Sequence, residues 1–270
     1  MSKERIDILL VEQGFFDSRE QAKRAVMAGI VLAEDEPVDK PGTKVSRAAE
    51  LRLKGKEQPY VSRGGLKLEK ALDVFQIDME GRVFLDVGAS TGGFTDCALQ
   101  HGASYVYAVD SGTNQLAWKI RNDEKVKVLE KYNFRYADPL DFQPRPDRAA
   151  ADVSFISLKH LLPPLSSILA EDSRLSLLVK PQFEAGREQV GKKGIVRDPA
   201  VHKNVLHDIT AFAEAKGFHP ASLDYSPVTG GDGNIEYLLY LEWHPRKFSQ
   251  THASRDITRV VEQAHSSHSP

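Results

Sequence analysis

The chain has little of several features that mark common classes of protein. Its 270 residues include one cysteine, Cys97, which excludes a disulfide framework and a zinc site made of cysteines. No stretch approaches the ~18 consecutive apolar residues of a membrane-spanning helix. In residues 1–16, charged and polar side chains interrupt every apolar run, so no signal peptide is expected. These absences predict a soluble, cytoplasmic protein with no membrane partner.

A strong excess of charge is also missing. Lys and Arg number 36, and Asp and Glu number 38, which gives a formal net charge of −2. Contact with a nucleic acid must therefore come from local basic patches rather than from the charge of the whole chain. The length is enough for one large hydrophobic core and a small additional domain.

The segment from Val83 to Asp110, VFLDVGASTGGFTDCALQHGASYVYAVD, is the most informative part of the chain. An apolar strand (83–87) runs into a turn of small residues, a helix follows, and a second apolar strand (105–109) ends at Asp110. This order predicts the opening strand, helix and strand of an open α/β sheet, whose ligand crevice lies at the carboxyl ends of the strands. The glycines let the backbone approach a ligand, and the helix start offers free N–H groups.

This pattern resembles the S-adenosylmethionine (SAM) site of Rossmann-like methyltransferases, in which an acid ending the second strand accepts the ribose hydroxyls. A dinucleotide site is an alternative, but its G-x-G-x-x-G is absent because Ser90 occupies the place of the second glycine. A glycine-rich turn without a ligand is a third reading. The resemblance implies a set of donor-binding residues: Asp86, Gly88, Ser90, Thr91, Gly92, Gly93, Phe94, Asp110, Asn133 and Asp152.

Residues 1–58 have the pattern of a separate small α+β domain. Apolar spacing predicts a helix over 5–13 and a second helix over 19–28, with Ser18 as its N-cap. Short strands are expected near residues 30–32, 38 and 51–53. The pattern Arg5-x-Asp7, then Ser18-Arg19-x-x-Ala22-x-x-x-Val26-x-x-Gly29-x-Val31, resembles the S-four type of RNA-binding domain. It departs from that type at residues 33–37, where AEDEP adds acidic residues in place of an Asn-Gly turn.

Basic residues in and after this domain are candidates for contact with RNA phosphates. Arg19, Lys23 and Arg24 lie at i, i+4 and i+5 on one helix face, and further cations concentrate in the returning segment. A charge-rich helix is commonly just a solvated face, but such a cluster engages phosphates even in a nearly neutral domain. The RNA-binding residues expected from these arguments are Arg5, Arg19, Lys23, Arg24, Lys44 and Arg63.

The rest of the chain continues the α/β pattern. After a linker (59–64), an amphipathic helix carries Lys67 near its start, where a cation opposes the helix dipole. A long loop, 185–199, is a candidate lid, and residues 246–270 look like a polar tail that is partly mobile. The domain from 65 to 245 is expected to contain strands over 126–129, 149–152, 175–179, 221–226 and 236–243, with helices over 158–169 and 201–216.

Four charged residues of alternating sign are expected in the crevice. Asp152 and Lys180 end parallel strands, Glu236 opens the last strand, and Lys67 enters from the preceding helix. Around a methyl donor such a set suits alkylation of a ribose hydroxyl, which needs a base because its pKa lies far above 7. A lysine amine can be that base when burial and a neighbouring cation lower its pKa. Any one of the four alone is equally well an ordinary charge at a strand end.

Taken together, the motifs resemble those of the TlyA (hemolysin A-like) family over about residues 3–243. They are S-R-x-x-x-K-L, L-D-V-G-x-S-T-G-G-F, A-D-V-S-F-I-S, V-K-P-Q-F-E and G-N-I-E. The resemblance implies an FtsJ-like, SAM-dependent methyltransferase domain, with a mostly parallel seven-stranded sheet whose last strand is antiparallel, beside the S-four domain. It implies no metal and a catalytic tetrad of Lys67, Asp152, Lys180 and Glu236. The implied substrate is the 2′-hydroxyl of cytidines in ribosomal RNA, free or in assembled subunits.

Other functions remain alternatives. A C5-type base methyltransferase needs a nucleophilic cysteine, and Cys97 lies within a helix where packing is its expected role. Amino-directed enzymes usually carry Asn/Asp-Pro-Pro-aromatic after the fourth strand, where this chain has DVSF. A noncatalytic RNA-binding factor that has kept the SAM fold is a further reading, whereas a hemolysin would need an insertion segment that is not evident. The oligomeric state stays open.

Overall fold

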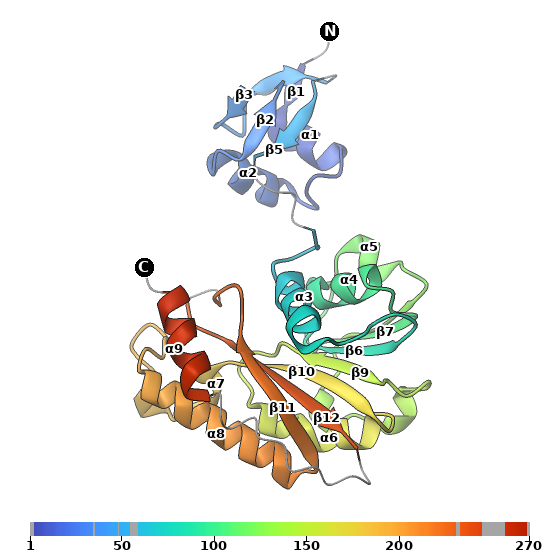
Figure 1. Ribbon diagram of the computed structural model, residues 1–270. Coiled ribbons are helices and arrows are strands. Elements are labelled where there is room, and N and C mark those ends of the chain that lie inside the picture. The colour runs from blue at the N-terminus through green and yellow to red at the C-terminus, as the bar shows by residue number, and fades with distance from the viewer. Residues whose placement is uncertain are drawn as a thin grey trace. The chain divides into compact units, whose positions relative to one another are not determined.

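The computed structural model describes residues 3–34, 36–47, 49–54, 59–230, 233–244 and 257–268. The chain forms two compact units, residues 1–58 and 59–270, here called the N-terminal unit and the C-terminal unit (Figure 1). Each unit has its own hydrophobic core.

Short helices and strands make up the N-terminal unit. Ser18 caps the second helix as expected, since its hydroxyl oxygen accepts a hydrogen bond from Gln21 N at 3.3 Å. Strand β2 pairs antiparallel with β3 and β5, and β1 pairs antiparallel with β4. The pair β1–β4 was not expected, because its polar segments show no apolar alternation. The elements are β1 (Lys3–Arg5), α1 (Ile6–Glu12), α2 (Arg19–Met27), β2 (Val31–Ala33), β3 (Glu36–Val38), β4 (Lys44–Ser46) and β5 (Leu51–Leu53).

A seven-stranded sheet, as far as the described residues extend, is the frame of the C-terminal unit. Its order is β11-β12-β10-β9-β6-β7-β8. Strands β10, β9, β6, β7 and β8 run parallel, whereas β12 is antiparallel to both of its neighbours. The predicted fold class is therefore confirmed. The strands are β6 (Val83–Val87), β7 (Tyr105–Val109), β8 (Val126–Leu129), β9 (Arg148–Ala151), β10 (Ser173–Val179), β11 (Phe218–Tyr225) and β12 (Tyr237–Trp243).

Helices cover both faces of this sheet (Figure 1). Because successive side chains of a strand point to opposite faces, Phe84 packs with the core beneath α3 and α4, while Leu85 belongs to the core beneath α6, α8 and α9. The longer helices are α3 (Gly64–Phe75), α4 (Gly93–Gln100), α6 (Leu162–Ile168), α8 (Pro199–Ala215) and α9 (Ile257–Ser267). The short ones are α5 (Trp118–Arg121), α7 (Pro181–Glu184), η1 (Phe134–Tyr136), η2 (Pro139–Asp141), η3 (Leu158–His160) and η4 (Arg187–Gln189).

Helix α9 differs from the expected polar tail. Ile257, Val260, Val261 and Ala264 follow the spacing i, i+3, i+4 and i+7, and all four side chains are buried in the larger core. This apolar stripe was overlooked because histidine and serine dominate the composition of the segment. Residues 245–256 and 269–270, where part of the expected mobility falls, lie outside the described residues.

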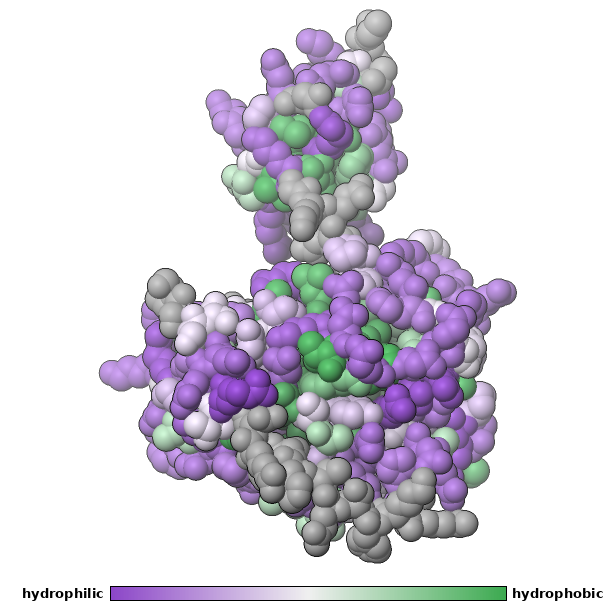
Figure 2. Space-filling model, viewed as in Figure 1, coloured by the Kyte–Doolittle hydropathy of each residue, from purple (hydrophilic) through white to green (hydrophobic). Residues whose placement is uncertain are grey.

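The surface in view is mostly hydrophilic on each unit (Figure 2). Among the described helices, none combines the length and the apolar character needed to span a bilayer. A few large apolar side chains of the C-terminal unit are nevertheless exposed, and Phe155 is the most exposed of them at 91%.

Candidate active site

The sheet topology brings the four predicted charged residues to one edge. Asp152 and Lys180 directly follow β9 and β10, whose carboxyl ends point the same way because the strands are parallel. Glu236 directly precedes β12, which is antiparallel, so its start lies at that same edge. Lys67 reaches the group from the first turns of α3.

These side chains form one network of hydrogen-bonded ion pairs. Lys67 Nζ lies 2.7 Å from Glu236 Oε2 and 3.1 Å from Asp152 Oδ2. Lys180 Nζ lies 2.5 Å from Asp152 Oδ1 and donates to Ser154 Oγ at 3.2 Å. The carboxylate of Asp152 therefore sits between the amino groups of the two lysines and bonds to both.

Burial gives these contacts their electrostatic weight. Lys67 and Lys180 are each 8% exposed and Glu236 is 2% exposed, so an unpaired charge here would carry a large desolvation cost. Burial by itself raises the pKa of Asp152, but the two lysines outweigh it and hold that pKa below its usual value. Burial likewise opposes the charged form of Lys67, yet Asp152 and Glu236 hold its pKa above the ordinary lysine value. Lys67 is thus fixed as a cation.

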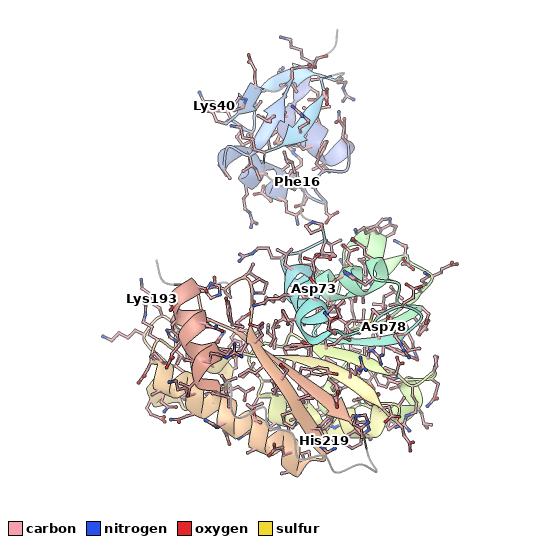
Figure 3. All side chains as sticks on the ribbon, in the orientation of Figure 1. Phe16, Lys40, Asp73, Asp78, Lys193 and His219 are labelled. Carbon is pink, nitrogen blue, oxygen red and sulfur yellow. The ribbon has the colours of Figure 1, made fainter. Side chains whose placement is uncertain are left out.

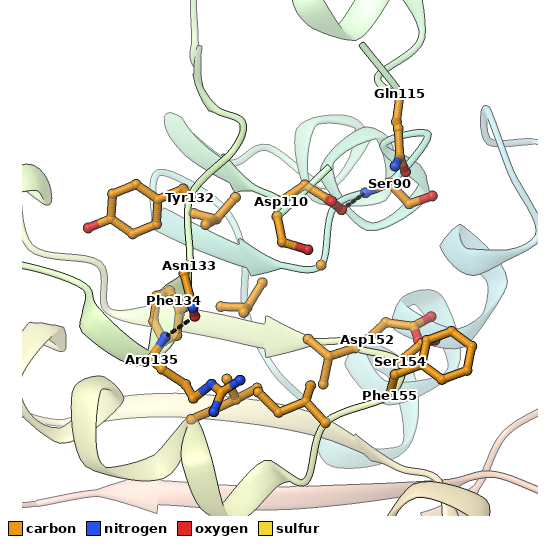
Figure 4. Close-up of a pocket in the computed structure, with 17 residues that line it drawn as sticks. Ser90, Asp110, Gln115, Tyr132, Asn133, Phe134, Arg135, Asp152, Ser154 and Phe155 are labelled. Carbon is orange, nitrogen blue, oxygen red and sulfur yellow. Dashed lines mark hydrogen bonds between the residues drawn. The ribbon is translucent and has the colours of Figure 1, made fainter. Parts of the chain in front are cut away.

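A cavity of about 380 Å³ opens beside the glycine-rich turn (Figure 4). At its wall, Asp110 Oδ2 accepts a hydrogen bond from Ser90 N at 2.8 Å, and Asp110 Oδ1 accepts one from Gly112 N at 2.7 Å. Gly88 has a φ of +88°, and a Cβ there would lie 2.5 Å from the carbonyl oxygen of Asp152. Only glycine therefore lets the turn pass this close to the backbone that follows β9. Lining residues include Gly88, Ser90, Asp110, Asn133, Asp152 and Ser154.

A second cavity, of about 340 Å³, adjoins the first at the end of β9. All four residues of the charged network line it, together with Thr91, Gly93 and Phe94 of the turn and α4. Both cavities share Gly88, Ser90, Asp152 and Ser154. A ligand in the first cavity can therefore present a group to the charged network through this shared boundary.

Two of the expected donor-binding residues lie away from both cavities. Asp86 is fully buried in β6, where its Oδ2 accepts from Thr95 N at 3.0 Å and from Thr95 Oγ1 at 2.7 Å. Burial raises the pKa of this carboxyl to about 7. Gly92 precedes α4, and a Cβ there would approach Leu116 to 3.0 Å. In this structure Asp86 is therefore bonded to α4, and Gly92 lies against Leu116.

Three of the expected RNA-binding residues of the N-terminal unit form ion pairs with acidic side chains. Arg5 Nε and Arg19 Nη2 each lie 2.9 Å from a carboxylate oxygen of Asp7, whose side chain is fully buried. Hydrogen bonds from Arg5 and then Arg19 lower the pKa of Asp7 to about 2. Lys23 Nζ pairs with Glu20 Oε1 at 2.7 Å.

The remaining three cations of that set are exposed. Within the described part of the chain, no ion pair is found for Arg24 or Lys44. Arg63 belongs to the C-terminal unit, where it lines the second cavity and donates to the carbonyl oxygen of Thr229 at 3.4 Å.

Some residues at the site had not been singled out. Ser154 lines both cavities and accepts from Lys180, and Phe155 beside it has a φ of +62° with its ring centroid 5.0 Å from that of Phe183. A positive φ is uncommon for a bulky residue and marks a site where strain is retained. The motif DVSF contained both residues, but its spacing gave no sign of which side chains face the cavity. Asn234, in the motif GNIE, was also overlooked; it lines neither cavity but bonds to the backbone of Gly194 and Val196.

The sequence of this chain is similar to those of known methyltransferases and RNA-binding domains. Residues 60–243 match the model of the FtsJ-like methyltransferase family, and residues 4–51 match the S4 domain. The 16S/23S rRNA (cytidine-2′-O)-methyltransferase TlyA of Mycobacterium tuberculosis is 43% identical over 88% of this chain and 89% of its own. The chain belongs to the TlyA family of FtsJ-like methyltransferases.

Two further similar proteins match nearly the whole length of this chain. A candidate rRNA methyltransferase of Bacillus subtilis, YqxC, is 56% identical over 97% of this chain and 94% of its own. A solved structure from Streptococcus thermophilus, described as a candidate hemolysin, is 54% identical with a TM-score of 0.79, covering 99% of this chain and 97% of that chain. The family predicted from the motifs is confirmed, and with it the assignment as a methyltransferase.

Proposed function

We propose that this enzyme transfers the methyl group of SAM to the ribose 2′-hydroxyl of cytidines in ribosomal RNA, in the cytoplasm. The observation that carries the proposal is the network of Lys67, Asp152, Lys180 and Glu236, which lines a cavity adjoining that of the glycine-rich turn. Relatives named for this reaction support the choice of substrate. The S4 domain supports RNA as the partner.

The first cavity suits the donor. Asp110 would accept the ribose hydroxyls of an adenosine, Asn133 would lie near the adenine, and Gly88 and Ser90 would face the methionine end; all four line this cavity. When bound, SAM supplies an electrophilic methyl group on a sulfonium sulfur. Because the two cavities share Gly88, Ser90, Asp152 and Ser154, a methyl group at that end of SAM would face the charged network.

The charged network suits activation of a hydroxyl. Lys67 is held as a cation by two carboxylates, whereas Lys180 bonds to one carboxylate and to the hydroxyl of Ser154. In its neutral form Lys180 would accept the proton of the 2′-hydroxyl as the new O–C bond forms, and Asp152 would stabilise the resulting ammonium. Lys67 and Glu236 position Asp152 for that task.

An aromatic pair supports a nucleotide as the substrate. Phe155, which lines the first cavity, is almost fully exposed, and its ring lies against that of Phe183. Exposed aromatic rings stack on unpaired bases in many RNA-binding sites, and each stack is worth about 1–3 kcal/mol. A cytosine turned out of its helix would find such a surface beside the reacting ribose.

Cys97 offers no alternative nucleophile for base methylation. Its side chain is fully buried in α4, and burial raises the pKa of its thiol to about 12. A thiol that stays protonated at neutral pH does not attack a pyrimidine ring.

Transfer of tritiated methyl from SAM to ribosomal subunits tests the proposal. The subunits would come from a strain that lacks the enzyme, and nuclease digestion would locate the label. Label on the ribose is expected; label on a base ring would overturn the proposed reaction. Calorimetry with SAM and with NADH tests the donor separately, and tight binding of NADH without binding of SAM would contradict its assignment.

A further inference from the structure

A second basic surface lies in the C-terminal unit, on the segment from Arg187 to Arg197, here called the basic loop. It follows Lys180 and α7 in the chain and surrounds a cavity of about 390 Å³. Its four cations, Arg187, Lys192, Lys193 and Arg197, are exposed, and within the described ranges none of them forms an ion pair. Figure 3 shows Lys193 at the outer edge of the unit.

The basic loop is held in place by buried groups. Asn234 is 2% exposed; its Nδ2 donates to the carbonyl oxygen of Gly194 at 2.9 Å, and its Oδ1 accepts from Val196 N at 3.1 Å. His202 Nε2 donates to the carbonyl oxygen of Val196 at 3.0 Å, and the Val196 side chain is packed into the core. The loop also closes on itself, since Gly191 N donates to the carbonyl oxygen of Ile195 at 3.1 Å. The cations are therefore presented from a fixed backbone.

This anchoring places the basic loop at the same edge of the sheet as the charged network. The loop starts seven residues after Lys180, and Asn234, which fixes it, lies two residues before Glu236. Two residues of extended chain span no more than about 7 Å. The motif GNIE thus joins two tasks: its Asn holds the basic loop and its Glu belongs to the charged network.

We propose that the basic loop binds the phosphodiester backbone of the substrate RNA next to the target ribose. Fixed, exposed and unpaired cations are what phosphate contacts require, because each neutralised phosphate releases a counterion and no carboxylate has to be displaced first. Such contacts set the register of the RNA without reading its sequence. The proposal rests on the proposed function for its substrate but concerns a surface outside both cavities.

The double variant Lys192→Ala/Lys193→Ala of the full chain tests this proposal. We expect its Kd for ribosomal RNA to rise about tenfold and its salt slope to fall by about 1.4–1.8, from two lost phosphate contacts. Affinity for SAM should not change. The matched control is Lys125→Ala/Lys216→Ala, which removes two exposed cations at the opposite edge, before β8 and before β11. It should bind RNA like the wild type.

The outcomes separate the two proposals. Unchanged RNA affinity and salt slope in the Lys192→Ala/Lys193→Ala variant would overturn the role of the basic loop, even if the wild type methylates ribosomal RNA. An equal loss in the control variant would also overturn it, because the effect would then be one of total charge. Absence of methyl transfer by the wild type would instead contradict the proposed function, while the binding measurement would still report on the basic loop.

Discussion

The two units hold a carboxylate in the same manner, between two cations, and use it differently. The two triplets are Lys67–Asp152–Lys180 in the C-terminal unit and Arg5–Asp7–Arg19 in the N-terminal unit. The first lines a cavity, and its lysine side chains are 9–10% exposed; the side chains of the two arginines are 40% and 51% exposed. A lysine amine can lose and accept a proton, whereas a guanidinium cannot do so in a protein. Under the proposed mechanism, the same electrostatic arrangement serves proton transfer in the C-terminal unit, whereas in the N-terminal unit it can only hold a buried carboxylate.

Replacement of Lys180 should have the largest effect. Lys180→Ala removes the proposed base, and Lys180→Arg keeps the positive charge but cannot take a proton, so both should lower methyl transfer by about 10²–10⁴-fold. SAM affinity should stay close to that of the wild type, because the loss falls on the transition state. Tritiated-methyl transfer and calorimetry measure the two quantities. Turnover by Lys180→Arg at the wild-type rate would refute the assignment of the base.

The corresponding substitution in the N-terminal unit, Arg19→Ala, should lower the stability of that unit. Arg19→Ala leaves the buried Asp7 with one cation, and we expect the free energy of unfolding of this unit to fall by about 1–3 kcal/mol. Arg19→Lys should recover most of that loss, in contrast to Lys180→Arg. Urea denaturation of the full chain, followed by the NMR signals of α1, measures the change. A fully stable Arg19→Ala unit would mean that Arg5 alone satisfies Asp7.

The difference between paired and unpaired cations can be tested on RNA binding. Arg24→Ala/Lys44→Ala removes two exposed cations for which the described residues show no ion pair, so the Kd for ribosomal RNA should rise several-fold, with a salt slope lower by about 1–2. SAM affinity and unfolding free energy should be unaffected. This pair is a cleaner probe than Arg19, whose loss also disturbs folding. A salt slope equal to that of the wild type would show that Arg24 and Lys44 make no contact with RNA phosphates.

The smallest expected effect is a pH dependence of the N-terminal unit. Its Asp7 has a pKa of about 2 when folded, against 3.8 for a free side chain. A depressed carboxyl pKa contributes stability above the unfolded pKa, so that contribution should be complete above pH 4 and lost as the pH falls toward 2. Its size should be about 1 kcal/mol, because water screens the half-exposed arginines. Asp7→Asn should abolish this slope, and urea denaturation between pH 2 and 5 measures it.

Regular elements with a clear period were predictable from the sequence. Strands β6, β7 and β8 have the bounds that their apolar runs indicated, and the network of Lys67, Asp152, Lys180 and Glu236 came together because strand ends of a parallel sheet share one edge. Pairings across loops were not predictable. Arg19 and Arg24 look alike in helical spacing, yet only Arg19 reaches Asp7, twelve residues earlier in the chain. The anchoring of residues 194–196 by Asn234, about forty residues later, is likewise visible only in three dimensions, and whether this loop also acts as a lid stays a prediction.

The place of β12 inside the sheet has a consequence for the order in which the charged network is assembled. β12 pairs with β10 on one side and β11 on the other, and Glu236 stands at its start. During translation the N-terminal unit can fold while later segments are still being made, since domains fold as units from the N-terminal end. Lys67 can pair with Glu236 only after a further 169 residues have been synthesised. A nascent chain that ends before Glu236 therefore lacks one of the two carboxylates that pair with Lys67, and its charged network is incomplete.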